Sequence, residues 1–271
     1  MAYANFKQTF WSKYIQHELE KKAILADFCN RQFEGEAKYG NQIKILGVGR
    51  PSIGNYTGAD IGTPETVQDS SVFLTIDKAK YFNFMVDDVD KAQSKPGLME
   101  ALMEEATLAM ALQIDSDIAE IAGKNAGTTS NSTQINSASL AKTAIDAAIL
   151  KLRENDVPLD ADVVMEIPPF VYAYLKEKYI DLDTDNTEML RKGIMGRYDG
   201  VRVRVTNNLY NDGTDYYCLV RTKKAVAYVN QIDKVEPYRP EGLFSDAIKG
   251  LNVYGIKVVR PKELYVIKAH K

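Results

Sequence analysis

Large apolar side chains recur at every second position over residues 72–76 and again over residues 82–86. A period of two residues is typical of β-strands, so both stretches are predicted to be strands. Pro96 follows, and proline is favoured in the first turn of a helix because its missing N–H is not needed there. Residues 98–122 contain neither proline nor glycine, which predicts one helix about 37 Å long at ~1.5 Å per residue.

The apolar face of this predicted helix changes position along its length. In the first half, one face carries Leu98, Leu102, Ala106 and Ala109. In the second half, the apolar residues fall on a different face, with Met110, Ile114, Ile118 and Ile121. A helix that lies on a single core keeps one apolar stripe. The shift predicts a spine that passes from one packing environment into another, and an ordinary long helix with a mixed surface is the alternative.

The rest of the chain mixes further helices and strands. Apolar spacing predicts one helix over residues 139–154 and another that starts at Pro168-Pro169 and runs through residue 178. Strands are predicted on either side of a turn within residues 41–56, and over residues 163–167, 201–205, 216–220, 225–229, 253–259 and 264–268. Because helices and strands do not alternate strictly, the predicted fold class is α+β. A length of 271 residues favours two lobes.

One stretch between predicted strands is acidic and rich in glycine. Residues 51–77 contain no lysine or arginine, and their acidic residues are Asp60, Glu65, Asp69 and Asp77. Strands on both sides of a flexible tip predict a long two-stranded extension. An isolated hairpin is only marginally stable in water, so the extension is expected to rest on another surface. A mobile surface hairpin is the alternative.

The first residues of the chain are rich in aromatic side chains. Phe6, Phe10, Trp11 and Tyr14 can share one helical face. Aromatic rings gain free energy on burial, so this segment is predicted to pack either on its own domain or on a neighbouring subunit. No apolar run follows a basic start, and none approaches the ~20 residues that span a bilayer, so neither a signal peptide nor a membrane span is expected.

Charge and cysteine content exclude some protein classes. The net charge of −3 and a pI near 5.6 do not indicate a basic nucleic-acid surface. Cys29 and Cys218 are far apart and suggest no disulfide framework, which favours a reducing compartment. Arg202 and Arg204 alternate with valines over residues 201–205, which predicts a half-buried strand with a basic outer face.

Motifs for catalysis or metal binding are weak. His17 and His270 are the only histidines, and neither lies in a recognisable nucleophile motif. Residues 181–186 begin like a calcium loop, but glycine is missing at the sixth position and glutamate at the twelfth. We therefore predict no catalytic, cofactor-binding or metal-binding residue, and no cofactor.

Several segments follow one another in an informative order. They are DSSVFLTIDKAKYFNFMVDDVDKAQS (69–94), NDVP (155–158), the proline pair (168–169), GIMG (193–196) with Gly200-Val201, and FSDAIKGLNVYGIKVVRP (244–261). Together with the long helix they resemble the major capsid (coat) proteins of tailed bacteriophages, which share the Hong Kong 97-like fold. The resemblance covers nearly the whole chain and rests on the number and order of the segments.

The resemblance implies a protein that self-assembles into an icosahedral phage head around double-stranded DNA. The expected partners are copies of itself in pentamers and hexamers, a scaffolding protein and a portal protein. Packaged DNA is expected inside without strong specific binding, and no membrane is involved. The expected location is the virion, assembled in the cytoplasm of a bacterial host. The alternatives are an encapsulin-like nanocompartment shell and a soluble enzyme of α+β fold.

The resemblance also implies a division of the chain. It gives an N-terminal arm (1–38), an extended loop with flanking strands (39–86), a peripheral domain with the spine helix (87–136), an axial domain (137–233) and the C-terminal strands of the peripheral domain (234–271). Contacts between subunits are predicted for Phe6, Phe10, Trp11, Tyr14, Asp60, Glu65, Asp69, Arg202 and Arg204. Some relatives cross-link a lysine of the loop to a neighbour. No such bond is expected here, because the lysines closest to the loop tip, Lys78 and Lys80, lie beyond Asp77.

Overall fold

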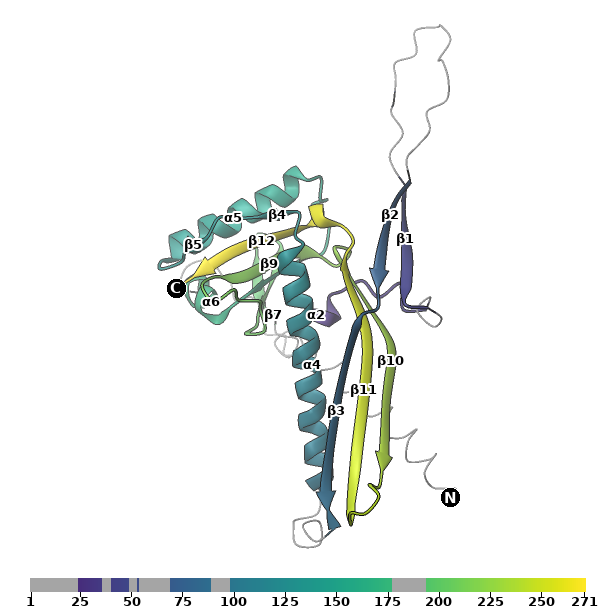
Figure 1. The fold of residues 1–271 in the computed structure, drawn as a ribbon. Coiled ribbons are helices and arrows are strands. Elements are labelled where there is room, and N and C mark those ends of the chain that lie inside the picture. The colour runs from purple at the N-terminus through teal and green to yellow at the C-terminus, as the bar shows by residue number, and fades with distance from the viewer. Residues whose placement is uncertain (1–23, 36–39, 49–52, 54–68, 89–97, 177–193) are drawn as a thin grey trace, which may run out of the picture.

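A helix of 27 residues runs beside a sheet of long antiparallel strands (Figure 1). The computed structural model describes residues 24–35, 40–48, 53, 69–88, 98–176 and 194–271. The helix is α4 (Leu98–Lys124), which confirms the helix predicted over residues 98–122. Among the described residues, the long sheet has the strand order β10 (Val226–Tyr238), β11 (Ser245–Val258) and β3 (Lys78–Asp87).

One face of the long sheet packs on α4. Side chains alternate along β3, so that Phe82 and Phe84 pack against the apolar cluster that contains Ile114 and Ile118 of the helix. The Phe82 ring lies over Gly250 of β11, where an added Cβ would come within 2.2 Å of the ring. Glycine at this position therefore lets the ring lie directly on the sheet backbone.

The buried stripe of α4 is continuous along the helix. It consists of Met103, Thr107, Met110, Ile114 and Ile118. The prediction for the second half is confirmed, but the prediction for the first half is wrong, because Ala109 is exposed while Thr107 is fully buried. Thr107 tolerates burial because its hydroxyl donates a 2.7 Å hydrogen bond to the carbonyl oxygen of Met103, one turn earlier.

The second sheet is mixed and is covered by α5 (Ala138–Glu154) and α6 (Pro169–Lys176). In the described part of the chain its strand order is β4 (Thr128–Thr129), β12 (Leu264–His270), β9 (Tyr216–Thr222), β6 (Val163–Ile167), β8 (Val201–Val205) and β7 (Ile194–Tyr198). β5 (Thr133–Gln134) also pairs with β12, which follows the 3₁₀ turn η1 (Pro261–Glu263). Ser137 caps α5 by accepting a hydrogen bond from the N–H of Leu140.

The strand pairing divides the chain differently from the predicted domains. β10 pairs with β11 from residue 226 onward, so residues 226–233 belong to the long sheet and not with the rest of segment 137–233. β12 pairs with β9, so residues 264–270 belong to the mixed sheet and not with the other strands of segment 234–271. One apolar cluster joins α4 to both sheets, and this shared core explains why the two lobes interleave in sequence.

A pair of antiparallel strands, β1 (Gln42–Val48) and β2 (Asp69–Thr75), projects from the long sheet (Figure 1). Near its base, Ile43 and Leu74 are buried in a small apolar cluster with residues of β10. The backbones approach closely here, since a Cβ added at Gly255 of β11 would lie 2.7 Å from the carbonyl oxygen of Thr75. The strands of the predicted extension are confirmed. Of residues 49–68, which connect them, the structure describes only residue 53.

Candidate functional site

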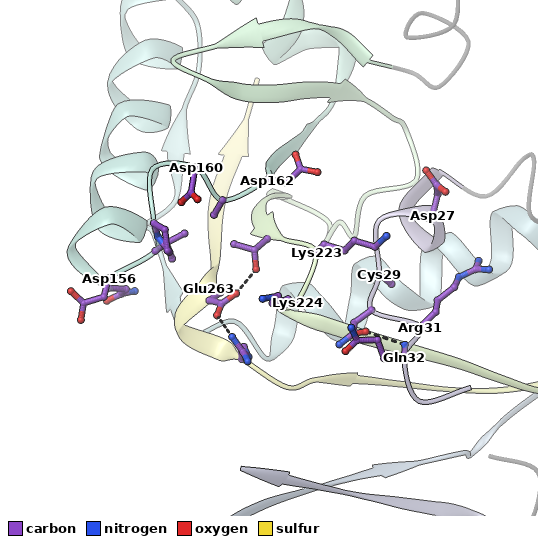
Figure 2. Close-up of a pocket in the computed structure, with 17 residues that line it drawn as sticks. Asp27, Cys29, Arg31, Gln32, Asp156, Asp160, Asp162, Lys223, Lys224 and Glu263 are labelled. Carbon is purple, nitrogen blue, oxygen red and sulfur yellow. Dashed lines mark hydrogen bonds and ion pairs between the residues drawn. The ribbon is translucent and has the colours of Figure 1, made fainter. Parts of the chain in front are cut away.

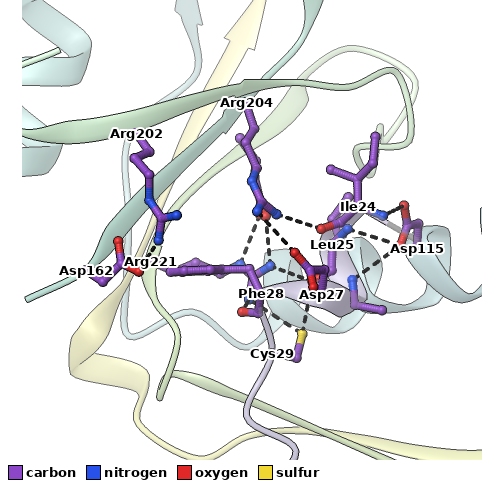
Figure 3. Close-up of polar contacts among 12 residues, drawn as sticks. Ile24, Leu25, Asp27, Phe28, Cys29, Asp115, Asp162, Arg202, Arg204 and Arg221 are labelled. Carbon is purple, nitrogen blue, oxygen red and sulfur yellow. Dashed lines mark hydrogen bonds and ion pairs between the residues drawn. The ribbon is translucent and has the colours of Figure 1, made fainter. Parts of the chain in front are cut away.

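The short helix α2 (Ile24–Asp27) is held by a network of charged side chains (Figure 3). Arg221 of β9 is fully buried, and its guanidinium donates hydrogen bonds to both carboxylate oxygens of Glu166, at 3.0 and 2.8 Å. It also donates to the carbonyl oxygens of Phe28 at 2.7 Å and Leu25 at 3.0 Å. Burial by itself lowers the pKa of Arg221, but the Glu166 carboxylate raises it above its ordinary value. A permanently charged side chain therefore ties β9 and β6 to α2.

Arg204 binds the same helix from β8. Its guanidinium donates a 2.8 Å hydrogen bond to the carbonyl oxygen of Ile24 and lies 3.4 Å from the carboxylate of Asp27. The side chain is buried, so the predicted basic outer face of this strand is wrong at Arg204. The alternation of valine and arginine was misleading because α2 covers the face that the pattern assigned to solvent. Arg202 remains partly exposed and forms an ion pair with Asp162.

Asp115 of α4 caps α2 at its N-terminal end. Its carboxylate accepts hydrogen bonds from the backbone N–H groups of Ile24, Leu25 and Ala26, at 3.1, 3.2 and 3.4 Å. These N–H groups have no partner within the helix, so the carboxylate satisfies them. Burial raises the pKa of Asp115 to about 6, although the three backbone hydrogen bonds oppose this shift. The N–H groups and the carbonyl oxygens of α2 are thus both bound by charged side chains.

The ring of Phe28, just after α2, lies among arginines (Figure 3). The guanidinium carbons of Arg202, Arg204 and Arg221 are 5.2, 5.5 and 5.5 Å from the ring centroid, within the range of cation–π contacts. The positive charges are balanced by carboxylates, those of Asp162, Asp27 and Glu166. This arrangement fixes α2 and Phe28 to the strands β8 and β9 and to α4, and it is called the anchor of α2 below.

Sequence reasoning missed this anchor, although the chain carries a signal for it. Glu166 and Arg221 each follow a run of apolar residues within a strand, and Asp115 follows Ile114 on the buried stripe of α4. Charged side chains are rarely buried without a partner. The pattern could have identified these residues as buried and paired, but the partners lie up to 196 positions apart in the chain.

His270 contacts Ser132 and Asp215, but not in the geometry of a catalytic triad. Its Nδ1 lies 3.2 Å from Ser132 Oγ and 2.9 Å from Asp215 Oδ1, and the serine hydroxyl donates to the same Asp215 oxygen at 2.8 Å. In a triad, the serine and the carboxylate bind opposite nitrogens of the imidazole, which then relays the proton. Here both use Nδ1, so the cluster joins β12 to a neighbouring loop. No group of three metal-ligating side chains occurs among the described residues.

A hollow of about 920 Å³ lies between α2, the loop after α5 and the turn that joins β9 to β10 (Figure 2). Its charged lining is mixed, with Asp27, Arg31, Asp156, Asp160, Asp162, Lys223, Lys224, Arg260 and Glu263. Cys29 also lines it, but burial raises the pKa of this thiol, so it is not an activated nucleophile. The hollow therefore has no single sign of charge that would select an anionic or a cationic ligand.

The predicted contact residues fall into separate groups. Those that lie outside the described residues are Phe6, Phe10, Trp11, Tyr14, Asp60 and Glu65. Asp69 is the first residue of β2 and pairs in register with Val48. Arg202 forms an ion pair with Asp162 of its own chain. Lys80 lies on β3, with its ammonium 3.7 Å from the Asp117 carboxylate of α4.

Large apolar side chains are exposed on the β1–β2 hairpin and on the long sheet. Leu46 and Phe73 of the hairpin are 66% and 51% exposed. On the sheet face away from α4, Tyr81 and Met85 of β3 are 79% and 61% exposed. Contiguous exposed apolar surface commonly marks a site of protein–protein interaction. No described helix has the length and apolar character needed to cross a membrane.

Comparisons with known proteins agree with one another. A family model described as phage capsid protein matches residues 69–267. A structure from Mycobacterium phage Che8 is 31% identical, covers 89% of each chain and has a TM-score of 0.75. The capsid structure of Cyanophage P-SCSP1u is 18% identical over 86% of this chain and 85% of that chain, with a TM-score of 0.72. A virus-like particle from Pyrococcus furiosus is 14% identical over 96% of this chain and 99% of that chain, with a TM-score of 0.60. The last two show a shared fold. No curated protein matches the chain.

Proposed function

Because this chain belongs to the phage capsid protein family and is a major capsid protein of the virion, we propose that it acts by forming closed icosahedral shells of pentamers and hexamers around double-stranded DNA. The predicted α+β, Hong Kong 97-like fold is confirmed by the same matches. Function in such a protein depends on buried area and geometry between copies of the chain.

The main support for this proposal is the β1–β2 hairpin. It projects from the body (Figure 1). Large apolar side chains such as Leu46 and Phe73 are exposed on it. A two-stranded ribbon has little stability of its own in water. A neighbouring subunit beneath the hairpin would cover these side chains and add to the ~1,000 Å² that a specific interface needs.

The acidic residues of the extension support an electrostatic contribution to the same contact between subunits. We propose that the acidic side chains Asp60, Glu65 and Asp69 meet basic side chains of a neighbour, taken from Lys7, Lys13, Lys21, Lys22 and Arg202. Arg204 is left out because its guanidinium is buried against α2 of its own chain.

Neutralising the hairpin tests this contact. The triple change Asp60→Asn, Glu65→Gln and Asp69→Asn should lower the yield of shells, most strongly at low salt, where charge screening is least. The matched control neutralises Asp156, Asp160 and Asp199, which are exposed on the body. Shell yield is counted by electron microscopy. Equal yields for wild type and the hairpin variant at low salt would contradict the charge contact.

The DNA inside the shell is proposed to be held without specific binding, since the chain has a net charge of −3. A scaffolding protein and a portal protein are the proposed assembly partners. Expression of this chain alone tests the scaffold requirement, because well-formed closed shells from one gene would contradict it.

An encapsulin-like compartment is the second candidate, because the chain also shares its fold with the Pyrococcus furiosus particle. The contents of shells purified from their natural source separate the two functions. Genomic double-stranded DNA supports the phage head, and an enclosed enzyme supports the compartment.

A further inference from the structure

A buried polar layer lies between the long sheet and α4. Asn252 of β11 is 2% exposed, and in the strand register it lies between Asp233 of β10 and Lys80 of β3. Tyr254, two residues further along β11, donates a 2.7 Å hydrogen bond to Asp117 of α4. Residues two apart on a strand, and residues directly opposite on paired strands, share one face of a sheet. Asn252 and Asp233 therefore both face the helix side.

The hydrogen-bonding capacity of this layer is not satisfied within the described residues. Neither polar atom of the Asn252 side chain has a partner, and neither does Asp233 Oδ2 or Asn230 Oδ1, although all of these atoms are buried. Asn230 is opposite Tyr254 in the register and so shares the same face. Buried polar groups without a hydrogen-bond partner are destabilising, which makes such a cluster rare without a ligand or partner.

The unmet groups have the chemistry of a cation site. Three of the four unmet atoms are oxygens, one from the Asp233 carboxylate and one each from the amides of Asn230 and Asn252, and the fourth is the donor nitrogen of the Asn252 amide. An ammonium offers three donors and a positive charge, which matches this set. Burial raises the pKa of Asp233 to about 6, as expected of a carboxylate that lacks a cationic partner. Lys80, the nearest cation in the register, is engaged with Asp117.

The site can be reached from the edge of the sheet. β10 is the outer strand of the long sheet in the described part of the chain, and Asp233 and Asn230 lie on it. Asn30 pairs with this edge at residues 226–228, before the strand reaches Asn230 and Asp233. Edge strands are common sites for pairing with a segment of another chain. The segment 1–23 carries Lys7, Lys13, Lys21 and Lys22 against two glutamates, and it has no arginine.

We propose that a lysine from residues 1–23 of a neighbouring copy inserts its ammonium between Asp233, Asn230 and Asn252. The inference rests on the proposed shell assembly, and it names the surface that receives the N-terminal segment of the next subunit. The inserted charge neutralises Asp233 and supplies donors to oxygens that have none in the isolated chain.

Zero-length cross-linking tests the proposal in assembled shells. A water-soluble carbodiimide activates a carboxylate and joins it to an adjacent lysine as an amide, with the carbodiimide released as a urea. Shells are assembled from equal amounts of ¹⁴N and ¹⁵N protein, so that mass spectrometry separates links within a chain from links between chains. The expected product joins Asp233 to a lysine of residues 1–23 and is half mixed-isotope.

Variants and alternative outcomes complete the test. Asp233→Asn should abolish this link and lower the midpoint of shell disruption in guanidinium, whereas the exposed control Asp160→Asn should change neither. A link within one chain, a link to another segment or no link would overturn the proposal. Shells that form without the link would refute this inference alone, while failure to form any shell, even together with the scaffolding protein, would refute the proposed function and the inference with it.

Discussion

Replacing Arg221 by methionine tests whether the buried network anchors α2. The change leaves the Glu166 carboxylate, which is 0% exposed, without its partner, and it removes the donor to the carbonyl oxygen of Phe28. Breaking a buried ion pair on one side costs ~3–5 kcal/mol, which is a large part of the ~5–15 kcal/mol that stabilises a typical domain. We expect the free energy of unfolding to fall by about 4 kcal/mol.

The double variant Arg221→Met with Glu166→Leu separates the ion pair from the anchor. Replacement of both charges by apolar side chains of similar size is often neutral, so the remaining cost is the loss of the hydrogen bonds to Leu25 and Phe28 at ~1 kcal/mol each. The double variant should therefore be about 2 kcal/mol more stable than Arg221→Met. Urea unfolding of the dissociated subunit, followed by circular dichroism, measures both values.

The anchor predicts a local effect as well. In the folded double variant, α2 has lost two of its hydrogen bonds, so trypsin should cut after Lys21 and Lys22 faster than in wild type. The reasoning is refuted if Arg221→Met costs less than ~1 kcal/mol, or if the double variant is no more stable than the single one.

Further predictions concern buried groups elsewhere. Because the pKa of Asp115 rises from 3.8 to about 6 on folding, its ionisation between pH 4 and 6 lowers stability by ~3 kcal/mol; Asp115→Asn should lack this loss in urea titrations, and parallel pH profiles would contradict it. Gly250→Ala should cost ~1–3 kcal/mol because the new methyl meets the Phe82 ring, whereas Gly35→Ala, with nothing within 4 Å, should be neutral in the same unfolding assay. Burial raises the pKa of Cys218 to about 12, so this thiol should resist a disulfide reagent until urea unfolds the subunit, and rapid labelling of native shells would be inconsistent with the structure.

The parts of the fold that sequence predicted are those set by local pattern. α4 and β3 follow from the absence of helix breakers and from a period of two, both of which depend on neighbouring residues. The same local rule failed at Arg204, because the helix that covers it comes from a segment 180 positions away. The placement of β12 beside β9 could not be predicted either, since the long strands β10 and β11 separate the two in the chain.

In the candidate sites too, local sequence pattern predicts some features, and contacts between distant segments decide the others. The acidic, glycine-rich extension is visible in composition, and its strands were expected where the structure has them. The cap at Asp115 and the polar layer at Asn252 depend on which strand lies beside which helix. A short stretch of a single sequence does not show which distant strand or helix will lie beside it.

The core that α4 shares with both sheets has a mechanical consequence. A rod of 27 residues is ~40 Å long, and its side chains interlock with both bodies. We therefore expect a force applied at the turn between β10 and β11 to rotate the mixed sheet as well, because one helix and one apolar core connect the two sheets. Each subunit is thus expected to move as one rigid body, so that a change in the diameter of the proposed shell would come from sliding at the contacts between subunits.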